Sequence, residues 1–275
     1  MKSFDRRWIF LTIGLIVFVL LKFPFQLQYS PSVQTMGTFN ALEGLSPGST
    51  IFLAVDYGPS TQAEILPMHE AMLYQLLKKD IKIIAGSVIE TGPPLTDNTF
   101  EKIAQELKEE GIAKKYGVDF VNLGFKSGND VAIAKIGASI PETFPIDYRG
   151  NNVEDLPIMD GIVNFDQISL LISYSSGTPG TRQWLHQIQT RYKVRMVAGV
   201  TAVQAPDLYS FFQSNQLEGF LGGLVGAAEY EYLLDRPGNG MAGMNVQSIC
   251  HIFILGLILF GNIIYFRGRR KNNLE

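Results

Sequence analysis

The chain has 275 residues, of which 46% are hydrophobic, and its 23 lysine and arginine residues stand against 26 aspartate and glutamate residues. This composition is too apolar for a disordered protein, and the length suits one domain with attached segments. One cysteine and three histidines exclude a disulfide framework and leave little material for a metal centre, so we expect no cofactor and no metal. The sequence therefore indicates topology and fold class more directly than it indicates a reaction.

The first apolar segment runs from Trp8 to Leu21 without a charged residue, and residues 22–25 extend it to 18 residues, about 27 Å of helix. Trp8 and Lys22 suit the two interfaces of a bilayer, because an indole ring prefers the headgroup level and a lysine stem reaches it. We expect an uncleaved transmembrane helix that stops by Pro24. A cleavable signal peptide is the alternative, but no small-x-small cleavage site follows the apolar run.

The second apolar segment, Val246 to Phe266, contains 21 residues and no aspartate, glutamate, lysine or arginine. Four basic residues follow it within five positions. Its length and composition predict a second transmembrane helix.

The charges outside the central region predict the orientation. Residues 27–245 hold 15 basic and 24 acidic residues, a net charge of −9, whereas the two flanks hold eight basic and two acidic residues. Basic residues next to transmembrane helices stay in the cytoplasm, so we expect both termini there and the central domain outside it. A cytoplasmic domain on a hairpin anchor is the alternative, and it would require both basic ends to cross the membrane. The acidic central region also disfavours nucleic acid as a partner.

The predicted organisation has five parts. Residues 1–26 are a basic tip and the first transmembrane helix, and residues 27–49 are a juxtamembrane arm with a short helix from about Val33 to Leu45. Residues 50–234 form the extracytoplasmic domain, residues 235–245 a flexible linker, and residues 246–275 the second transmembrane helix with a basic tail.

Short β-branched and aromatic runs alternate with amphipathic stretches in the central region. The predicted strands are Ile51–Asp56, Ile81–Val88, Phe120–Phe125, Ile168–Tyr174 and Val194–Val200. The predicted helices are Gln62–Lys79, Asn98–Lys115, Asp130–Ser139 and Arg182–Arg191. This alternation predicts an α/β fold with one open, mostly parallel sheet of about five strands, Rossmann-like or flavodoxin-like.

The stretch from Pro141 to Asp166 interrupts the alternation with prolines and turn residues. At 26 residues it is longer than an ordinary connection. We expect it to line a site or a partner surface.

Two loops at predicted strand ends are candidates for chemistry, because the carboxyl ends of parallel strands form the usual ligand crevice. Asp56 closes the first strand, where a carboxylate accepts a proton or holds a ligand; the alternative is that it satisfies backbone donors in a turn. Ser175, Ser176, Gly177, Thr178 and Gly180 follow the fourth strand and are candidates for binding a ligand or an anion. The same residues also suit helix capping, and they match neither the dinucleotide fingerprint nor the P-loop. The weak catalytic candidates are Asp56, Ser176 and Thr178.

His69 and His186 are the histidines between the two apolar segments. Both fall within predicted helices, and we expect packed or surface imidazoles rather than members of a catalytic triad.

A glycine-rich segment precedes the second apolar run. Four-residue spacings join small residues in the row Gly219, Gly222, Gly223, Gly226 and Ala227. As a helix, this segment would present a strip of small side chains that lets another backbone approach closely. The approaching element would be a helix of the same domain, a partner protein or second copy, or the segment would be a ligand loop.

Two functions remain open at this stage. The first is a membrane-tethered, non-catalytic protein of the cell membrane whose extracytoplasmic domain binds a partner protein or ligand as an accessory or assembly component of an envelope complex. The second is a membrane-anchored enzyme that acts on envelope material through the strand-end crevice. The expected partners are the lipid bilayer and another membrane or envelope protein or a second copy of the chain.

Overall fold

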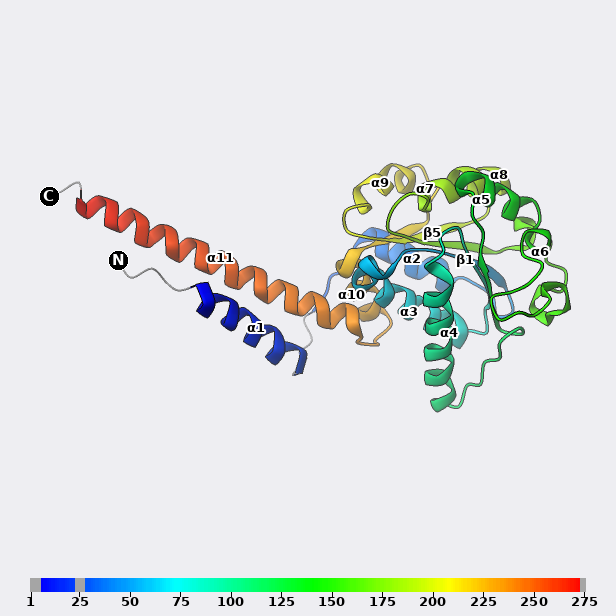
Figure 1. The fold of residues 1–275 in the computed structure, drawn as a ribbon, viewed down its shortest axis with the longest axis horizontal. Coiled ribbons are helices and arrows are strands. Elements are labelled where there is room, and N and C mark those ends of the chain that lie inside the picture. The colour runs from blue at the N-terminus through cyan, green and yellow to red at the C-terminus, as the bar shows by residue number, and fades with distance from the viewer. Residues whose placement is uncertain (1–5, 23–27, 273–275) are drawn as a thin grey trace. The chain divides into compact units, whose positions relative to one another are not determined.

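The computed structural model describes residues 6–22 and 28–272. Contacts divide the chain into two units, one of residues Tyr29–Gly240 and one that combines Met1–Gln28 with Met241–Glu275. The first unit is an α/β domain (Figure 1), and the second contains the two terminal helices.

Six strands of the described chain form a single parallel sheet with the order β3-β2-β1-β4-β5-β6. The strands are β1 (Thr50–Asp56), β2 (Lys82–Ser87), β3 (Phe120–Phe125), β4 (Leu170–Ser175), β5 (Met196–Val200) and β6 (Gly219–Gly222). The chain fills one half of the sheet from β1 outward to β3 and then returns to place β4 on the other side of β1. This order makes the sheet Rossmann-like, with the switch between the halves at β1 and β4.

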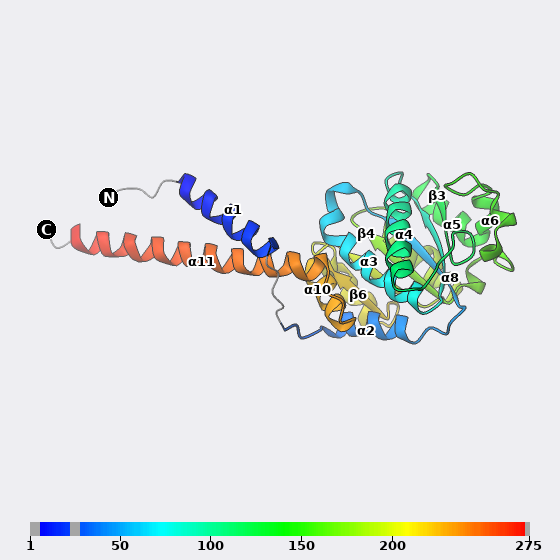
Figure 2. The same ribbon diagram turned by 90° about the horizontal axis from the view of Figure 1, so that it is seen from below.

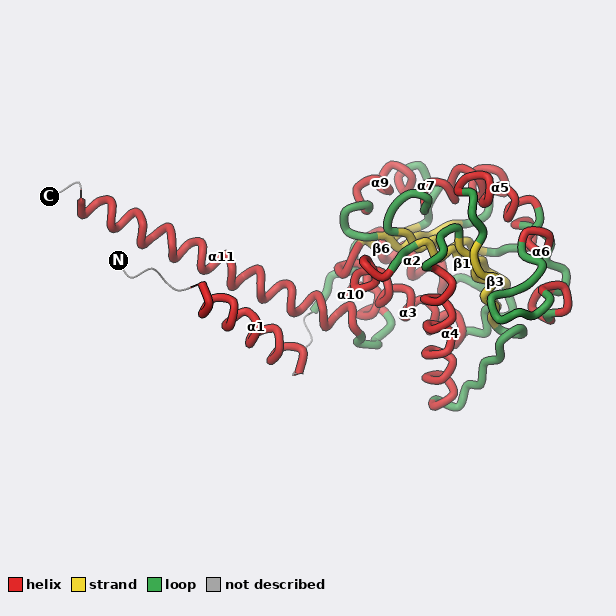
Figure 3. Tube along the Cα trace, viewed as in Figure 1, coloured by secondary structure: helices red, strands yellow, loops and turns green. Residues whose placement is uncertain are grey.

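Helices cover both faces of the sheet, with the strands between them in Figure 3. The helices of the domain are α2 (Val33–Glu43), α3 (Gln62–Lys78), α4 (Gly92–Glu109), α5 (Asn129–Ala138), α6 (Ile140–Thr143), α7 (Thr181–Trp184), α8 (Thr190–Tyr192), α9 (Ala205–Gln213) and α10 (Gly223–Leu233). Side chains of α2, α3, α4 and α10 pack on one face, and side chains of α5 to α9 pack on the other. Figure 2 shows α2 beside α10 and β6.

The two faces follow from the period of a strand, in which successive side chains point to opposite sides. In β1, Ile51, Leu53 and Val55 belong to one apolar core, whereas Phe52 and Ala54 belong to the other. The sequence therefore predicted the sheet correctly at β1, where both faces are buried and the run is continuously apolar.

The sixth strand corrects the sequence prediction, which gave five strands and read residues 216–231 as one helix. The structure has β6 over Gly219–Gly222 and helix α10 only from Gly223. Phe220 and Leu221 point into opposite cores, as strand neighbours do. Gly223 has a φ of +56°, which breaks the strand before the helix begins.

Strand β6 and helix α2 approach each other closely within the domain, and Gly219 and Gly37 permit this approach. A Cβ on Gly219 would lie 2.2 Å from the backbone nitrogen of Thr38, and a Cβ on Gly37 would lie 2.2 Å from the carbonyl oxygen of Glu218. Gly222, the next position of the predicted strip, ends the strand, and Gly226 and Ala227 are buried in α10. The strip predicted on one helix is therefore divided between a strand and a helix.

Helix α4 begins six residues before the predicted start at Asn98 and ends at Glu109 instead of Lys115. Pro93 lies in its first turn, where a missing N–H costs no hydrogen bond. The chain leaves the helix through Gly111, whose φ is +85°. The predicted helix at Arg182–Arg191 is a run of α7, a π-helical turn (Leu185–Gln189) and α8.

The excursion from Pro141 to Asp166 packs on the sheet through part of its length. It contains three 3₁₀ turns at Val153–Asp155, Pro157–Met159 and Phe165–Gln167. Val153, Ile158 and Phe165 are buried in the same core as α5 and α7.

The second unit contains α1 (Arg6–Lys22) and α11 (Asn239–Asn272). Among the described residues, the helical stretch Asn239–Arg267 is the one long and apolar enough to cross a membrane by length and composition. The apolar helix Arg7–Leu20 is too short to count as a spanning helix by the same measure. Of the two predicted transmembrane helices, the structure therefore supports the C-terminal one. The predicted extension of the first span past Lys22 and its stop by Pro24 lie outside the described residues.

The linker prediction also changes. Helix α11 begins at Asn239, within the residues 235–245 that were predicted to be a flexible linker. The segment between α10 and α11 consists of the helix cap Leu234 and residues 235–238.

Candidate functional site

The candidate crevice lies at the carboxyl ends of β1 and β4, where the strand order reverses. Asp56 and Ser175, the last residues of these strands, are paired in register. The loops at 57–61 and 176–180 leave the sheet from this point. Ligands of open parallel sheets bind at such a switch point, so the structure brings the predicted residues to the edge where chemistry was expected.

Asp56 does not face solvent, since its exposed fraction is 2%. Its Oδ1 accepts hydrogen bonds from the backbone N–H of Val88 at 2.8 Å and from Ser87 Oγ at 3.2 Å, and its Oδ2 accepts one from Trp184 Nε1 at 2.6 Å. Burial raises the pKa of Asp56 to about 6, and these hydrogen bonds oppose the rise. The carboxylate of Asp56 therefore accepts hydrogen bonds from the domain, which was the alternative to a catalytic role. One of its donors is the indole N–H of Trp184.

Trp184 packs in the apolar core on one face of the sheet. Its side chain is fully buried, and its ring lies 5.5 Å from that of Phe52 and 6.4 Å from that of Phe165. From this position its indole N–H donates to Asp56 Oδ2. The contact joins residues 128 positions apart, so no local pattern in the sequence pointed to it.

The loop after β4 begins with a hydroxyl network. Ser175 Oγ accepts a hydrogen bond from the backbone N–H of Thr181 at 3.1 Å and contacts Thr181 Oγ1 at 2.9 Å, and Thr181 Oγ1 also contacts Ser173 Oγ at 3.1 Å. A Cβ on Gly180 would lie 2.5 Å from the carbonyl oxygen of Gly177, so glycine is required for this loop to close on itself. These contacts correspond to the capping alternative for Ser175 and Gly180.

A small cavity of about 120 Å³ lies beside this loop, and the loop residues that line it include Ser175, Gly177 and Thr178. Gln204 Nε2 donates to the carbonyl oxygen of Gly177 at 3.2 Å, and the buried Gln204 Oε1 has no hydrogen-bond partner. Pockets for drug-sized ligands measure about 300–1,000 Å³, so the cavity suits a small polar group and not a nucleotide. Asp56 and Ser176, two of the three catalytic candidates, are not among its lining residues.

The histidine and acidic side chains of the described chain do not gather into a group of three or more that would hold a metal ion. His69 is fully buried, with Nδ1 3.0 Å from the hydroxyl of Tyr57 and its ring 4.6 Å from that of Tyr174. Burial lowers the pKa of His69 to about 3, so the imidazole is neutral at physiological pH. The sequence analysis expected either a packed or a surface imidazole, and His69 is packed.

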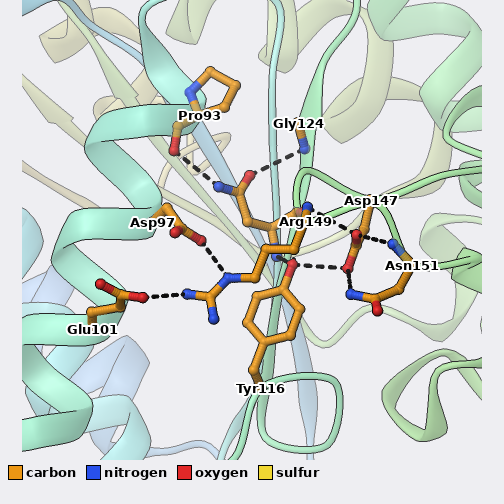
Figure 4. Close-up of polar contacts among 9 residues, drawn as sticks. Pro93, Asp97, Glu101, Tyr116, Gly124, Asp147, Arg149 and Asn151 are labelled. Carbon is orange, nitrogen blue, oxygen red and sulfur yellow. Dashed lines mark hydrogen bonds and ion pairs between the residues drawn. The ribbon is translucent and has the colours of Figure 1, made fainter.

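A second site lies at edge strand β3 (Figure 4), within the Pro141–Asp166 excursion that the sequence predicted to line a site or a partner surface. The carboxylate of Asp147 is 5% exposed and accepts four hydrogen bonds. The donors are the hydroxyl of Tyr116 at 2.9 Å, the backbone N–H groups of Arg149 at 2.9 Å and Asn151 at 2.7 Å, and Asn151 Nδ2 at 2.9 Å. Asp147 thereby fixes the turn Ile146–Asn152, whose ends form an antiparallel bridge.

The turn is also attached to helix α4 and to strand β3. The Arg149 guanidinium lies 4.0 Å from the ring centroid of Tyr116 and pairs with Asp97 at 3.0 Å and Glu101 at 3.1 Å. The backbone N–H of Tyr148 donates to the carbonyl oxygen of Asn122 in β3 at 2.9 Å. Figure 4 shows Arg149 extended between the acidic side chains and the Tyr116 ring.

The turn presents apolar side chains to solvent on both sides of the buried Asp147. Ile146 is 54% exposed and Tyr148 is 46% exposed, and the backbone of Tyr148 lies against Gly124, beside Phe125, which is 40% exposed. A local signal for the turn existed, because aspartate and glycine occupy the first and fourth positions in Asp147–Gly150. Its attachment to Tyr116 and α4 had no local signal.

Searches against protein-family models, curated proteins and solved structures find no significant match to this chain. The fold and site define its class: a Rossmann-like α/β domain with a buried aspartate at the switch point, followed by a helix long and apolar enough to cross a membrane.

Proposed function

We propose that the chain is a membrane-tethered, non-catalytic protein whose α/β domain binds a partner protein through the turn Ile146–Asn152. The observation that carries the proposal is the combination of a buried, hydrogen-bonded Asp56 at the switch point with a hydrogen-bonded turn that exposes Ile146 and Tyr148. Apolar and aromatic side chains held in place before binding lose little conformational entropy in a complex. The partner is another membrane or envelope protein or a second copy of the chain.

The crevice supports a binding role over an enzymatic one. An acid or base must reach the proton that it transfers, either directly or through one water molecule. Asp56 is 2% exposed, and both of its oxygens already accept hydrogen bonds from the domain. The enzymatic reading, in which Asp56, Ser176 and Thr178 act together on envelope material, therefore lacks an accessible acid or base.

The membrane tether and its orientation complete the proposal. Helix α11 supplies the tether, and α1 with its extension supplies a second, shorter apolar segment. The basic residues that flank both segments favour cytoplasmic termini and a domain on the opposite side of the cell membrane.

Labelling of introduced cysteines tests the orientation. In a Cys250→Ala background, a cysteine at Val203, which is 86% exposed, should react with a membrane-impermeant maleimide in intact spheroplasts. A cysteine replacing Asn273 should react only after lysis. The reverse pattern would place the domain in the cytoplasm and overturn the export of the domain.

Substitution of the exposed turn tests the docking role. The double change Ile146→Ser and Tyr148→Ser should weaken cross-linking of the chain to its partner by roughly 30- to 100-fold, since each buried anchor of an interface contributes at least about 1 kcal/mol. The measurement is the yield of cross-linked complex from native membranes as a function of protein concentration. Val203→Ser is the matched control, because it removes an equally apolar and more exposed side chain at another loop. Equal yields for the double variant and the unmodified chain, with both folded by circular dichroism, would remove the turn from the interface.

A further inference from the structure

Two carboxylates of helix α10 bind the two ends of the domain's chain, at the start of α2 and at the start of α11. The first is the start of α2, which follows Tyr29. Glu229 is buried, and its Oε2 accepts hydrogen bonds from the backbone N–H of Ser32 at 3.1 Å, from Ser32 Oγ at 2.7 Å and from Thr35 Oγ1 at 2.6 Å. This carboxylate therefore fixes the N-terminus of α2 against α10, across 197 positions of sequence.

The second place is the start of α11. Glu231, two residues further along α10, accepts hydrogen bonds from the backbone N–H groups of Gly238 at 3.0 Å and Gly240 at 2.9 Å. A Cβ on Gly238 would lie 2.6 Å from Glu231 Oε1, so the glycine permits this approach. The first residues of the apolar helix are thus bound to the domain, which differs from the flexible linker expected from the sequence.

The partly exposed Tyr29 and the exposed Val33 and Tyr232 lie next to these places. The rings of Tyr29 and Tyr232 are 6.0 Å apart, and Tyr232 is 41% exposed. Val33, in the first turn of α2 after Ser32, is 72% exposed. We call Tyr29, Val33 and Tyr232 the tyrosine end of the domain.

Chain length keeps the tyrosine end close to both apolar helices. Tyr232 precedes Asn239, the first residue of α11, by seven positions, and Tyr29 follows Lys22, the last residue of α1, by seven. Seven residues span at most about 25 Å even when fully extended. Glu231 also binds Gly240, so the end of α10 is hydrogen-bonded to the residues that open α11.

We infer that the tyrosine end lies in the headgroup layer of the lipid bilayer, so that this end of the domain is in contact with lipid. This inference rests on the proposed membrane tether. Tyrosine rings favour this layer because one part of the ring is apolar and the hydroxyl remains hydrated, and Val33 adds apolar area beside them. Glu229 and Glu231, the acidic side chains of α10, are buried and hydrogen-bonded, so they do not present free carboxylates to the lipid. Asp235, which follows α10, is exposed.

The test uses an environment-sensitive fluorophore at single cysteines in the full chain, with Cys250→Ala as background. The NBD group is attached at Val33→Cys or, as the matched control, at Val203→Cys; both native side chains are largely exposed valines, at 72% and 86%. Each protein is reconstituted into phosphatidylcholine and phosphatidylglycerol vesicles, and quenching is measured with aqueous iodide and with lipids that carry a doxyl group near the headgroup. Flotation of the protein with the vesicles measures the tether separately.

At position 33 the iodide quenching constant should be roughly fivefold lower than at position 203, and only position 33 should be quenched by the doxyl lipid, as expected for a group within 5–10 Å of the headgroup boundary. Iodide quenching at position 33 equal to that at position 203, in protein that floats with the vesicles, would overturn the inference and leave the tether intact. Failure to float would overturn the tether. Protection at position 33 without doxyl quenching, lost when each vesicle holds one copy, would assign the tyrosine end to contact between copies and would also overturn the inference.

Discussion

Trp184→Ala should lower the free energy of unfolding by about 3–5 kcal/mol, the usual range for deleting a large aromatic side chain from a core. The indole is fully buried in the apolar core on one face of the sheet, and its removal leaves a cavity beside Phe52 and Phe165. It also removes the donor that binds Asp56 Oδ2 at 2.6 Å. The measurement is urea unfolding of the full chain in mild detergent, followed by circular dichroism.

Two further variants separate the causes of this loss. Trp184→Phe keeps most of the apolar volume but lacks the N–H group, so it should cost about 1–3 kcal/mol, the penalty for an unsatisfied buried polar group. Trp8→Phe is the control, since Trp8 is 62% exposed and should leave the unfolding transition in place. A Trp184→Ala protein as stable as the unmodified chain would contradict the assignment of the indole as a packed part of the core that binds Asp56.

The stability of the domain should fall as the pH rises from about 4 to about 6, because Asp56 binds its proton more tightly in the folded state than in the unfolded state. Burial raises the pKa of Asp56 from 3.8 to about 6, so the stabilising contribution is complete below the unfolded value and is lost as the pH rises through the folded value. A change of about two pKa units corresponds to about 3 kcal/mol. The measurement is the free energy of unfolding in urea at half-unit steps of pH.

Asp56→Asn isolates this contribution, because asparagine does not titrate. Carboxyl groups with a lowered pKa change stability in the opposite direction; for example, hydrogen bonds from Gln75 and Lys79 lower the pKa of Glu43. The pH dependence of the unmodified chain minus that of Asp56→Asn should therefore decrease between pH 4 and 6 and be level above that range. Parallel curves for the two proteins would show that Asp56 is not the buried acid that the structure describes.

The Rossmann-like strand order exists here without the glycine pattern of a dinucleotide site. The strand order brings Asp56 and Ser175 together at the position where such folds bind cofactors. Asp56 is buried at that position, and Trp184, from the segment after β4, donates a hydrogen bond to its carboxylate. Apolar and aromatic side chains are exposed instead at the turn Ile146–Asn152 and at the tyrosine end.

The structure leaves some sequence predictions as predictions. Neither the cytoplasmic location of both termini nor the envelope partner is decided by the fold of the domain. The cavity beside the loop after β4 limits any bound anion to a small group. The hydroxyls of Ser175 and Thr181 already hydrogen-bond within the domain.

The sequence by itself determined the α/β class, five of the six strands and the apolar character of α11, because these features depend on local periodicity and on runs of apolar residues. It did not determine β6, whose four residues include two glycines and are too few to show a pattern. Gly219 is required by the backbone of α2, which lies about 180 positions earlier in the chain.

Only the tertiary structure decided what the polar residues do. Asp56 binds Trp184 across 128 positions, Asp147 binds Tyr116 across 31, and Glu229 binds Ser32 across 197. A carboxylate at a strand end or in a helix has the same local sequence whether it faces solvent, a ligand or a distant donor. Its role depends on which groups the packed chain places within about 3 Å of its oxygens, and that is set by contacts between segments and not by the sequence around it.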